Sequence, residues 1–574
     1  MVEGGVIAAR TARPRRRRSG RRRRLLTRTL PLLGLAACAF AAGVLLATQP
    51  GRDERQLVRR YVTAWERHDV AGMYAMLDQA SRARTSESTF AAQLESAADT
   101  ATLTSLRVVR VGAAHAGSVS VRMRVDTKVW GVLRETLVVP YTGSGSAARV
   151  RLSGTVLFPG LRPGERLTRV VSLPPRATLL ASDGTPLAQG PHRTSPIPDV
   201  ADEIVGTLGP MPPSLADTYA AQGYPATAQV GLDGLERIFQ RRLAGRPGGT
   251  LLAGRRVLAR ALPVPARPVK TTINPAMEGD AVAALGGQYG GIAVMNPRTG
   301  ALEALAGIAF SAVQPPGSTM KIITVTAALS AGLVNLGSTF PYATSTTIDG
   351  YTMQNASGED CGGTLLNAFA VSCNSVFAPL GARVGGTRLV AMAKRFGFDS
   401  QPSVLGAAES TIPSAGTIGD ALAVGSSAIG QGLVQATPLE MTDVAATIAM
   451  GGRRPIPTLL AHQRPRFVRV TSAKVAHEVQ QMMVAVVEFG TGTAAQIPGV
   501  EVAGKTGTAE LVDTATTTNN PNASSPKNTD AWFVGYAPVG HPRVVAGALF
   551  PNQGAGGAAA APPVRDVIAS ALGR

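Results

Sequence analysis

Three short sequence strings carry residue types that together can perform nucleophilic acyl transfer. They are Ser318-Thr-Met-Lys321, Ser372-Cys-Asn374 and Lys505-Thr-Gly-Thr508, in that order along the chain. A serine hydroxyl becomes a good nucleophile only beside a base, and a spacing of three residues places Lys321 on the same helix face as Ser318. The preceding Pro315-Pro-Gly317 is typical of a helix start, so backbone N–H groups near Ser318 are predicted to hold an oxyanion.

The two lysines are predicted to have different roles. Lys321 can act as the base only if its pKa falls, and burial together with a second positive charge at Lys505 would lower that pKa. The chain has fifty arginines and only seven lysines, yet lysine occupies both positions. Arginine is practically never neutral and could not replace a base at position 321. Ser372 and Asn374 are predicted to bridge the two lysines, relaying a proton and holding the substrate.

The third string is predicted to anchor the substrate. Thr506 and Thr508 would hydrogen-bond a substrate carboxylate, Gly507 would let the substrate approach the backbone, and the Thr508 N–H would complete the oxyanion hole. A second Ser-x-x-Lys match, Ser524-Ser-Pro-Lys527, lies in a stretch rich in Asn, Thr, Ser and Pro that has no helical period. We interpret that match as a solvated loop.

The ordered trio resembles that of the penicillin-binding proteins and serine β-lactamases. From Gly291 to Arg574 the resemblance to the penicillin-binding transpeptidase domain is nearly continuous. It includes the stretches Ala428-Ile-Gly-Gln-Gly432, Gly490-Thr-Gly-Thr493 and Ala531-Trp-Phe-Val-Gly-Tyr-Ala-Pro538. The resemblance implies that residues 286–574 form a serine transpeptidase or β-lactamase-like domain, an antiparallel sheet flanked by helices.

Two further domains are expected upstream, which makes the chain a multidomain α+β protein. Arg176 to Ala188 and Gly231-Leu-Asp-Gly-Leu-Glu236 resemble the elongated pedestal, or dimerisation-type, domain of class B penicillin-binding proteins, expected at 159–285. Residues 53–158 are predicted to form an α+β unit. Apolar residues first recur at helical spacing, at Val58, Tyr61, Val62 and Trp65. They then alternate at strand spacing, at Val119, Val121, Met123 and Val125. A last strand is expected from Val150 to Val156.

The stretch from Tyr61 to Tyr74 resembles the start of a nuclear-transport-factor-like domain. That resemblance implies a cone-shaped α+β domain, similar to the one in the low-affinity enzyme of methicillin-resistant staphylococci.

The first fifty residues predict a membrane anchor. Eleven arginines in residues 1–28 face a single acid and supply half of the net charge of +20, and residues 29–48 carry no charge. About twenty uncharged and mostly apolar residues are enough for one transmembrane helix, and a basic tail beside it tends to stay cytoplasmic. We therefore expect a single-pass protein of the cell membrane with its catalytic part outside the cytoplasm, and no nucleic-acid partner. A cleaved signal peptide and lipidation at Cys38 remain open.

The cysteines and histidines point to no metal site. Cys361 and Cys373 are either a disulfide or two free thiols, because the sequence does not give their Cβ separation. The six histidines have no metal-ligand spacing, so neither a metal nor another cofactor is expected; they are His68, His115, His192, His462, His477 and His541.

The resemblance implies a peptidoglycan D,D-transpeptidase that cross-links stem peptides through an acyl-enzyme on Ser318 and is covalently inhibited by β-lactams. Because no glycosyltransferase domain precedes the pedestal, a separate polymerase is the expected partner. Two alternatives stay open: a catalytically weak receptor or division scaffold that binds β-lactams or stems, and a D,D-carboxypeptidase with water as acceptor. The role in elongation, division or sporulation and the oligomeric state are also open.

Overall fold

The computed structural model describes residues 33–40, 51–511 and 528–574. The predicted basic tail at 1–28, most of the predicted anchor at 29–48 and the second Ser-x-x-Lys match at 524–527 lie outside the described residues. Residues 33–40 are helical and exposed. In the described part of the chain, no helix has both the length and the apolar character needed to cross a membrane. The transmembrane helix therefore remains a prediction.

The described residues divide into two compact units. Unit 1 contains the residues up to Ser172 together with Asp217–Tyr224 and Pro247–Leu262, and unit 2 contains the others. The predicted domain boundaries at 159 and 286 remain hypotheses drawn from the sequence.

Unit 1 has helices first and then an antiparallel sheet, as the sequence predicts. Its helices are α3 (Arg52–Glu66), α4 (Val70–Ala75), α5 (Gln79–Arg84) and α6 (Glu87–Thr100). The strands β1 (Leu103–His115), β2 (Ser118–Thr127), β3 (Gly131–Thr142) and β4 (Arg149–Val150) form one sheet in the order β1-β2-β3-β4. The predicted apolar stripe of α3 is completely buried at Val58, Tyr61 and Val62.

One predicted element of unit 1 is wrong in part. The strand expected from Val150 to Val156 ends at Val150, and residues 154–156 form a 3₁₀ turn. Val156 is nevertheless fully buried, because the turn brings its side chain into the core by a different backbone path. Apolar spacing over so few residues does not distinguish the two paths.

A second sheet in unit 1 joins residues that are far apart in the sequence. It has the order β11-β10-β5, with β5 at Leu167–Ser172, β10 at Gly248–Ala253 and β11 at Arg256–Ala261. Leu251 and Ala253 of β10 are buried in the same apolar cluster as α3. The indole N–H of Trp130 donates to the Gly249 carbonyl at 3.0 Å. Thus part of the predicted pedestal sequence packs in unit 1.

The remaining pedestal residues belong to unit 2 and centre on a buried ion pair. The strands β6 (Leu179–Leu180), β7 (Pro186–Ala188) and β12 (Val269–Lys270) form a small sheet, and α9 (Gly234–Ile238) carries Glu236. The fully buried Glu236 carboxylate contacts Arg176 at 2.5 Å and Arg193 at 2.6 Å. Removing one partner of a buried ion pair leaves an uncompensated charge. The stretch Gly231–Glu236 is therefore structural in this protein.

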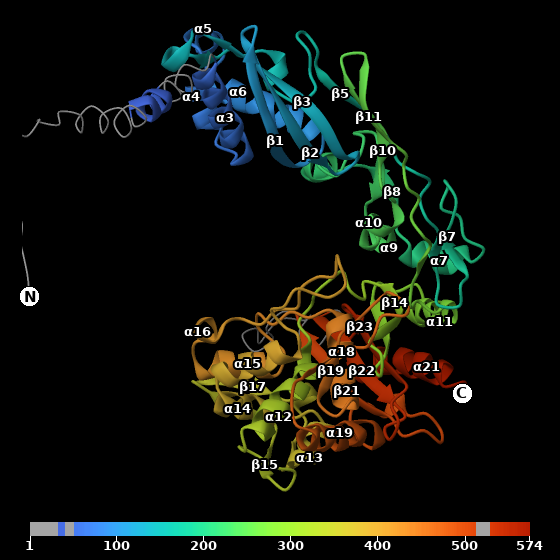
Figure 1. Cartoon of the computed structure of the whole chain (residues 1–574). Helices are drawn as coiled ribbons and strands as arrows, with labels where there is room; N and C mark the ends of the chain where they lie inside the picture. Colours follow the sequence, from blue (N-terminus) through green and yellow to red (C-terminus); the bar gives the residue numbers. More distant parts are fainter. Residues whose placement is uncertain (1–32, 41–50, 512–527) are drawn as a thin grey trace, which may run out of the picture. The chain divides into compact units, whose positions relative to one another are not determined.

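A five-stranded antiparallel sheet forms the centre of unit 2 (Figure 1). Its order is β14-β13-β23-β22-β21, with β13 at Gly291–Asn296, β14 at Ala301–Gly307, β21 at Ala503–Glu510, β22 at Thr529–Ala537 and β23 at Val544–Phe550. Helices α11 (Pro275–Leu285) and α21 (Ala561–Ala571) share an apolar cluster with one sheet face, and α18 (Pro438–Ala449) shares another with the opposite face. This arrangement confirms the predicted sheet flanked by helices.

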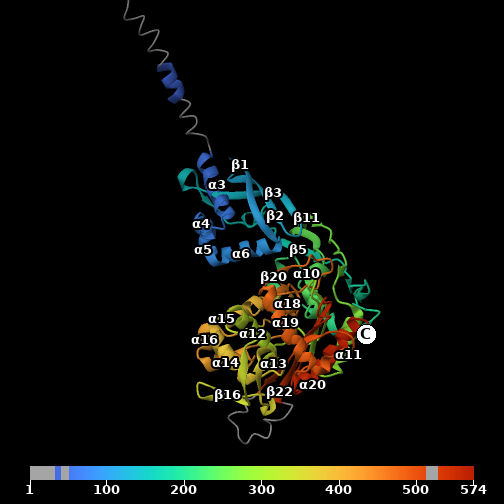
Figure 2. The same cartoon turned by 90° about the horizontal axis from the view of Figure 1, so that it is seen from below.

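A helical region packs beside this sheet. It contains α12 (Lys321–Ser330), α13 (Leu365–Ala370), α14 (Asn374–Val384) and α15 (Gly386–Phe396). In both views α12, α14 and α15 lie together, on the side of unit 2 away from α11 (Figures 1 and 2). All residues of α12 from Lys321 to Leu329 are buried, which is typical of a helix in the centre of a domain. The first turn of α12 is thereby held firmly.

A buried carboxyl group on α11 gives unit 2 a pH-dependent stability. Glu278 is fully buried; one carboxyl oxygen accepts the Leu305 N–H at 2.8 Å, and the other has no partner among the described residues. Burial raises the pKa of Glu278 to about 7. Below about pH 4.5 the Glu278 carboxyl is protonated in both the native and the unfolded state. Between about pH 4.5 and about pH 7 it ionises readily only in the unfolded state, so the free energy of unfolding falls as the pH rises through this range.

We therefore expect Glu278→Gln to become more stable relative to the wild type as the pH rises. The relative gain from about pH 4.5 to about pH 8 should be about 3 kcal/mol, because each unit of pKa shift corresponds to about 1.4 kcal/mol. Urea unfolding of both full-length proteins across this pH range measures the difference. An unchanged free-energy difference between variant and wild type at all pH values would contradict the assignment.

Candidate active site

The first and third strings meet through their glycines. Residues 317–320 form a 3₁₀ turn that leads into α12, which places Ser318 at the predicted helix start. Gly317 has φ +53°, and a Cβ there would lie 2.8 Å from the Thr508 carbonyl oxygen. A Cβ on Gly507 would lie 2.7 Å from the Pro316 carbonyl oxygen. Glycine is therefore needed at both positions, because β21 packs backbone to backbone against the turn that carries Ser318.

Lys321 is held by the second string. Its side chain is fully buried, and Nζ donates to the Ser372 carbonyl at 2.6 Å, to Ser372 Oγ at 3.2 Å and to Asn374 Oδ1 at 2.8 Å. Among the described residues, the half-buried Ser318 hydroxyl has no hydrogen-bond partner. The predicted link between Ser318 and Lys321 is thus not formed here, and such catalytic hydrogen bonds often tighten only when substrate binds.

Lys505 reaches the same serine from β21. It is fully buried, and Nζ donates to Ser372 Oγ at 2.9 Å and to the Thr506 carbonyl at 3.1 Å. Ser372 therefore bridges both lysines, as predicted. Asn374 contacts Lys321 and, through Nδ2, the Gln354 carbonyl at 3.0 Å, so its predicted bridge to Lys505 is not formed.

The environment lowers the pKa of both lysines. Burial, followed by the nearby charge of Lys505, lowers the pKa of Lys321 well below its usual value. Burial alone lowers the pKa of Lys505 to about 7. Burial thus favours the neutral form of both side chains, and the charge of Lys505 adds to this effect at Lys321.

Two aromatic rings that sequence reasoning did not identify line this pair. Lys321 Nζ lies 5.6 Å from the centroid of the Phe377 ring, and Lys505 Nζ lies 5.5 Å from that of Phe369. The two rings contact each other edge to face, with centroids 5.7 Å apart. Aromatic faces attract cations while excluding water, so they stabilise whichever lysine is charged without solvating it. Helical apolar spacing in α13 and α14 marks both residues only as core.

The threonines of the third string already have partners inside the protein. Thr506 Oγ1 lies 2.5 Å from Thr491 Oγ1, and Thr508 Oγ1 accepts the Gly556 N–H at 3.3 Å. Thr491 belongs to the stretch Gly490–Thr493, to which the sequence assigned no individual role. Either hydroxyl can donate in the Thr491–Thr506 contact, so Thr506 can accept from Thr491 and still donate to a substrate carboxylate. The substrate-binding role of these hydroxyls remains a prediction.

The open question of the cysteines has an answer in the structure. Cys361 on β18 (Cys361–Thr364) and Cys373, which directly precedes α14, are joined by a disulfide with their Cα atoms 5.9 Å apart. Cys373 is the middle residue of the second string. In the described part of the chain, no group of His, Cys, Asp and Glu side chains has the arrangement of a metal site.

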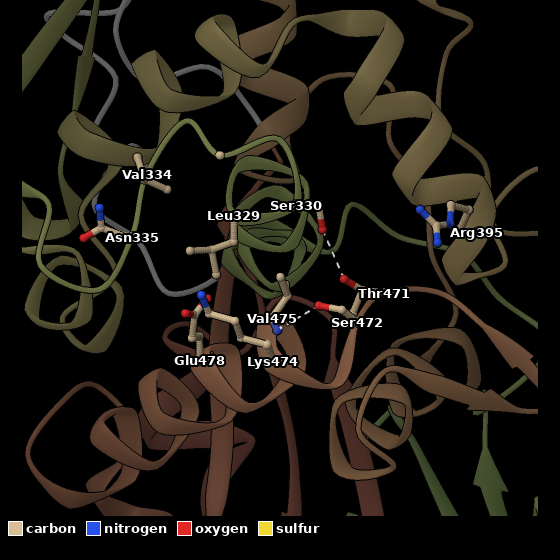
Figure 3. A pocket seen from close by; sticks show the side chains of 11 residues that line it. Leu329, Ser330, Val334, Asn335, Arg395, Thr471, Ser472, Lys474, Val475 and Glu478 are labelled. Carbon is tan, nitrogen blue, oxygen red and sulfur yellow. Dashed lines mark hydrogen bonds between the residues drawn. The ribbon is translucent and has the colours of Figure 1, made fainter.

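A pocket of about 510 Å³ lies elsewhere, at the C-terminal end of α12 (Figure 3). Ser330 and Thr471 face each other in it, and Arg395, Lys474 and Glu478 also line it. None of the predicted site residues, all of which the structure describes, contributes to its lining. The chemistry predicted from the sequence therefore belongs to the cluster around Ser372 and not to this pocket.

Comparison with protein families agrees with the geometry of this cluster. Residues 290–569 match the penicillin binding protein transpeptidase domain, and residues 174–256 match the penicillin-binding protein dimerisation domain. The chain carries a penicillin-binding protein transpeptidase domain. A dimerisation domain followed by this transpeptidase domain is the class B arrangement that the sequence analysis predicted.

Curated relatives are similar mainly in the transpeptidase domain. The peptidoglycan D,D-transpeptidase PbpA of Mycobacterium tuberculosis is 37% identical over 297 residues, which is 46% of this chain and 56% of the relative. The peptidoglycan D,D-transpeptidase MrdA of Acinetobacter baumannii is 25% identical over 442 residues, 65% of each chain. The chain thus spans little more than half the length of the PbpA relative.

Solved structures of penicillin-binding proteins are also similar. A crystal structure of PBPA from M. tuberculosis has 27% sequence identity and a TM-score of 0.55, covering 69% of this chain and 99% of that one. The penicillin G acyl-enzyme complex of the same protein has 28% identity and a TM-score of 0.53, with the same coverage of both chains. That relative forms an acyl-enzyme with a β-lactam.

Proposed function

We propose that this protein is a peptidoglycan D,D-transpeptidase that is acylated on Ser318 by stem peptides and by β-lactams. The observation that carries the proposal is the buried cluster in which Ser372 Oγ accepts hydrogen bonds from both Lys321 and Lys505. The transpeptidase domain match and the acyl-enzyme structures of similar proteins support it.

In the proposed acylation step, neutral Lys321 takes the proton of Ser318 as its Oγ attacks the carbonyl carbon of the D-Ala-D-Ala peptide bond. The backbone N–H groups of Ser318 and Thr508 hold the oxyanion. The carbon–nitrogen bond then breaks, and the proton passes through the Ser372 hydroxyl to the departing D-alanine amine. Charged Lys505 attracts the substrate carboxylate, with Thr506 and Thr508 as hydrogen-bond donors and Gly507 leaving the backbone accessible.

In the second step, an amine of a neighbouring stem attacks the acyl-enzyme ester. Lys321 accepts the amine proton and returns a proton to Ser318, so the enzyme is regenerated and a cross-link is formed. A β-lactam enters by the same first step. Its leaving amine stays attached to the acyl group, and the acyl-enzyme therefore persists.

The two lysine pKa values predict a bell-shaped pH dependence of acylation. The second-order rate constant with penicillin should fall at acid pH, where Lys321 becomes protonated, and at alkaline pH, where Lys505 loses its charge with a pKa of about 7 in the free enzyme. Lys505→Arg should shift the alkaline limb upward by more than about two pH units, because a guanidinium stays charged. Stopped-flow acylation across pH measures this, and an alkaline limb at the same pH in both proteins would contradict the role of Lys505.

The decisive experiment is a cross-linking assay with a purified glycosyltransferase polymerase and lipid-linked precursor. A transpeptidase releases D-alanine and joins strands, whereas a D,D-carboxypeptidase releases D-alanine without cross-links. A receptor or scaffold takes up fluorescent penicillin but does neither. Cross-linked product that disappears on addition of penicillin is the result we expect.

The proposal extends to the rest of the chain. We infer a single-pass cell-membrane protein anchored by residues 29–48, with the basic tail 1–28 in the cytoplasm, the catalytic domain outside it and a separate polymerase as partner. The eleven arginines beside an uncharged stretch support this topology. The helices and four-stranded sheet of unit 1 support a nuclear-transport-factor-like domain at 53–158, of the kind in the staphylococcal low-affinity enzyme. The pedestal at 159–285 and the transpeptidase domain at 286–574 complete this proposed organisation.

A further inference from the structure

We propose that Asn355 is a positioning residue for acylation, because it fixes the segment that carries Ser372 and Asn374. The inference rests on the proposed function of the Ser318 site, since positioning matters only if that site is acylated. Asn355 lies between β17 (Tyr351–Gln354) and β18, and its side chain is buried, with 5% exposure.

The Asn355 amide contacts the residue next to the second string through both of its polar atoms. Oδ1 accepts the Ser375 N–H at 2.8 Å, and Nδ2 lies 3.1 Å from Ser375 Oγ. Nδ2 also donates to the carbonyls of Ala343 at 2.7 Å and Glu359 at 2.9 Å. One buried side chain therefore ties the first turn of α14 to two separate backbone segments. The two hydrogens of Nδ2 serve three oxygens, so at least one is shared, and a buried amide with this many partners is strongly oriented.

Two further contacts tie the same two segments together. The Gln354 carbonyl accepts Asn374 Nδ2 at 3.0 Å, and Cys361 is bonded covalently to Cys373. We call residues 354–361 the motif clamp. Cys373, Asn374 and Ser375 are thus each held by this one short segment, and Ser372 directly precedes them.

The second string requires such support for two reasons. Ser372 has φ +65°, a left-handed conformation that is unfavourable for a residue with a side chain and persists only where its surroundings impose it. The residue before α14, Cys373, makes no side-chain cap, so the helix start lacks the usual hydrogen bond. The Asn355 amide accepts a first-turn N–H in its place. Without it, only the Gln354 contact and the disulfide of the motif clamp hold this segment, so Ser372 Oγ and Asn374 Oδ1 are positioned less firmly toward Lys321.

Asn355 acts through other residues and not on the substrate. Among the described residues its hydrogen-bond partners are Ala343, Thr344, Gly358, Glu359 and Ser375, and none belongs to the three strings. A purely structural role would lower stability and leave the acylation rate of the folded protein unchanged. The test must therefore separate rate from stability.

The test compares Asn355→Leu with Asn367→Leu in the full-length protein, with the disulfide kept oxidised. Asn367 Nδ2 donates to the Gly362 carbonyl at 3.0 Å in the same region but makes no hydrogen bond to residues 372–375, which makes it a matched control. We expect Asn355→Leu to reduce the first-order rate constant of acylation by fluorescent penicillin by about 10- to 100-fold, because small displacements of catalytic groups cost about this much. Asn367→Leu should acylate at the wild-type rate.

Further variants keep the test decisive. Ser375→Ala loses the two hydroxyl contacts, with Asn355 Nδ2 and with the Ala343 carbonyl, and keeps the N–H bond to Asn355, so its rate should fall by no more than about threefold. Asn355→Asp retains the acceptor for the Ser375 N–H, and its rate should lie between those of the wild type and Asn355→Leu. It decides the question if Asn355→Leu does not fold, as checked by circular dichroism.

The possible outcomes separate the two proposals. The positioning role would be overturned if the wild type is acylated and both folded Asn355 variants are acylated at the wild-type rate. It would also be overturned if Asn367→Leu loses as much acylation rate as Asn355→Leu. A wild-type protein that takes up no penicillin would overturn the proposed function itself.

Discussion

Ser318→Ala is expected to abolish covalent labelling by fluorescent penicillin completely. Ser318 lies in the turn that leads into α12, and Lys321 follows three residues later as the first residue of that helix. The backbone of β21 packs against Gly317, the residue before Ser318. Ser318 combines a hydroxyl that has no hydrogen-bond partner among the described residues with a fully buried lysine three residues later. Because labelling requires a covalent bond to the nucleophile, the loss should be complete and not partial.

The control for this prediction is Ser524→Ala, which alters the second Ser-x-x-Lys match. That serine lies outside the described residues, in a sequence without helical period. We expect labelling of Ser524→Ala to equal that of the wild type in a gel assay. Equal labelling of Ser318→Ala and wild type would show that the nucleophile lies elsewhere.

Much of this site could be predicted because its members come in short strings with fixed local geometry. Three-residue spacing predicts Lys321 beside Ser318, a link that the structure does not form, and an edge strand presents Lys505 in the same direction as Gly507. These relations depend only on the local backbone. The order of the strings and the flanking stretches then identified the domain, which the sheet order and the family match confirm.

The contacts between the strings could not be predicted in the same way. Asn355 and Phe369 reach the site from elements whose packing depends on the whole helical region, and no local pattern separates them from ordinary loop or core residues. The same reasoning applies to Thr491, whose hydroxyl faces Thr506 across fifteen positions of sequence. The disulfide between Cys361 and Cys373 also depends on a turn of the chain that spacing alone does not give.

Strand β1 could not be predicted from the sequence for a different reason. Its residues 103–115 are mostly exposed or half-buried, and only Leu106 and Val111 are buried. A strand without a continuous buried face has no alternating apolar pattern, which is the signal that revealed β2. Its pairing with β2 along its whole length is therefore visible only in the structure.

The lysine pair is expected to give the second large effect, because the two side chains must be in opposite protonation states. Lys321→Arg keeps a positive charge but cannot furnish a base, so acylation by any β-lactam should fall by about 10²- to 10⁴-fold. Lys505→Arg keeps the anion anchor with a different donor geometry. It should retain a measurable acylation rate, reduced most for ligands that bear a carboxylate.

The two substitutions form a matched pair, since both lysines are fully buried, both contact Ser372 Oγ and both lie against a phenylalanine ring. The steric cost of a guanidinium should therefore be similar at the two positions, and the difference in rate should report the difference in chemistry. Stopped-flow acylation of both variants, after circular dichroism has established that they fold, measures that difference. If Lys321→Arg is the milder change, the base and the anchor are assigned the wrong way round.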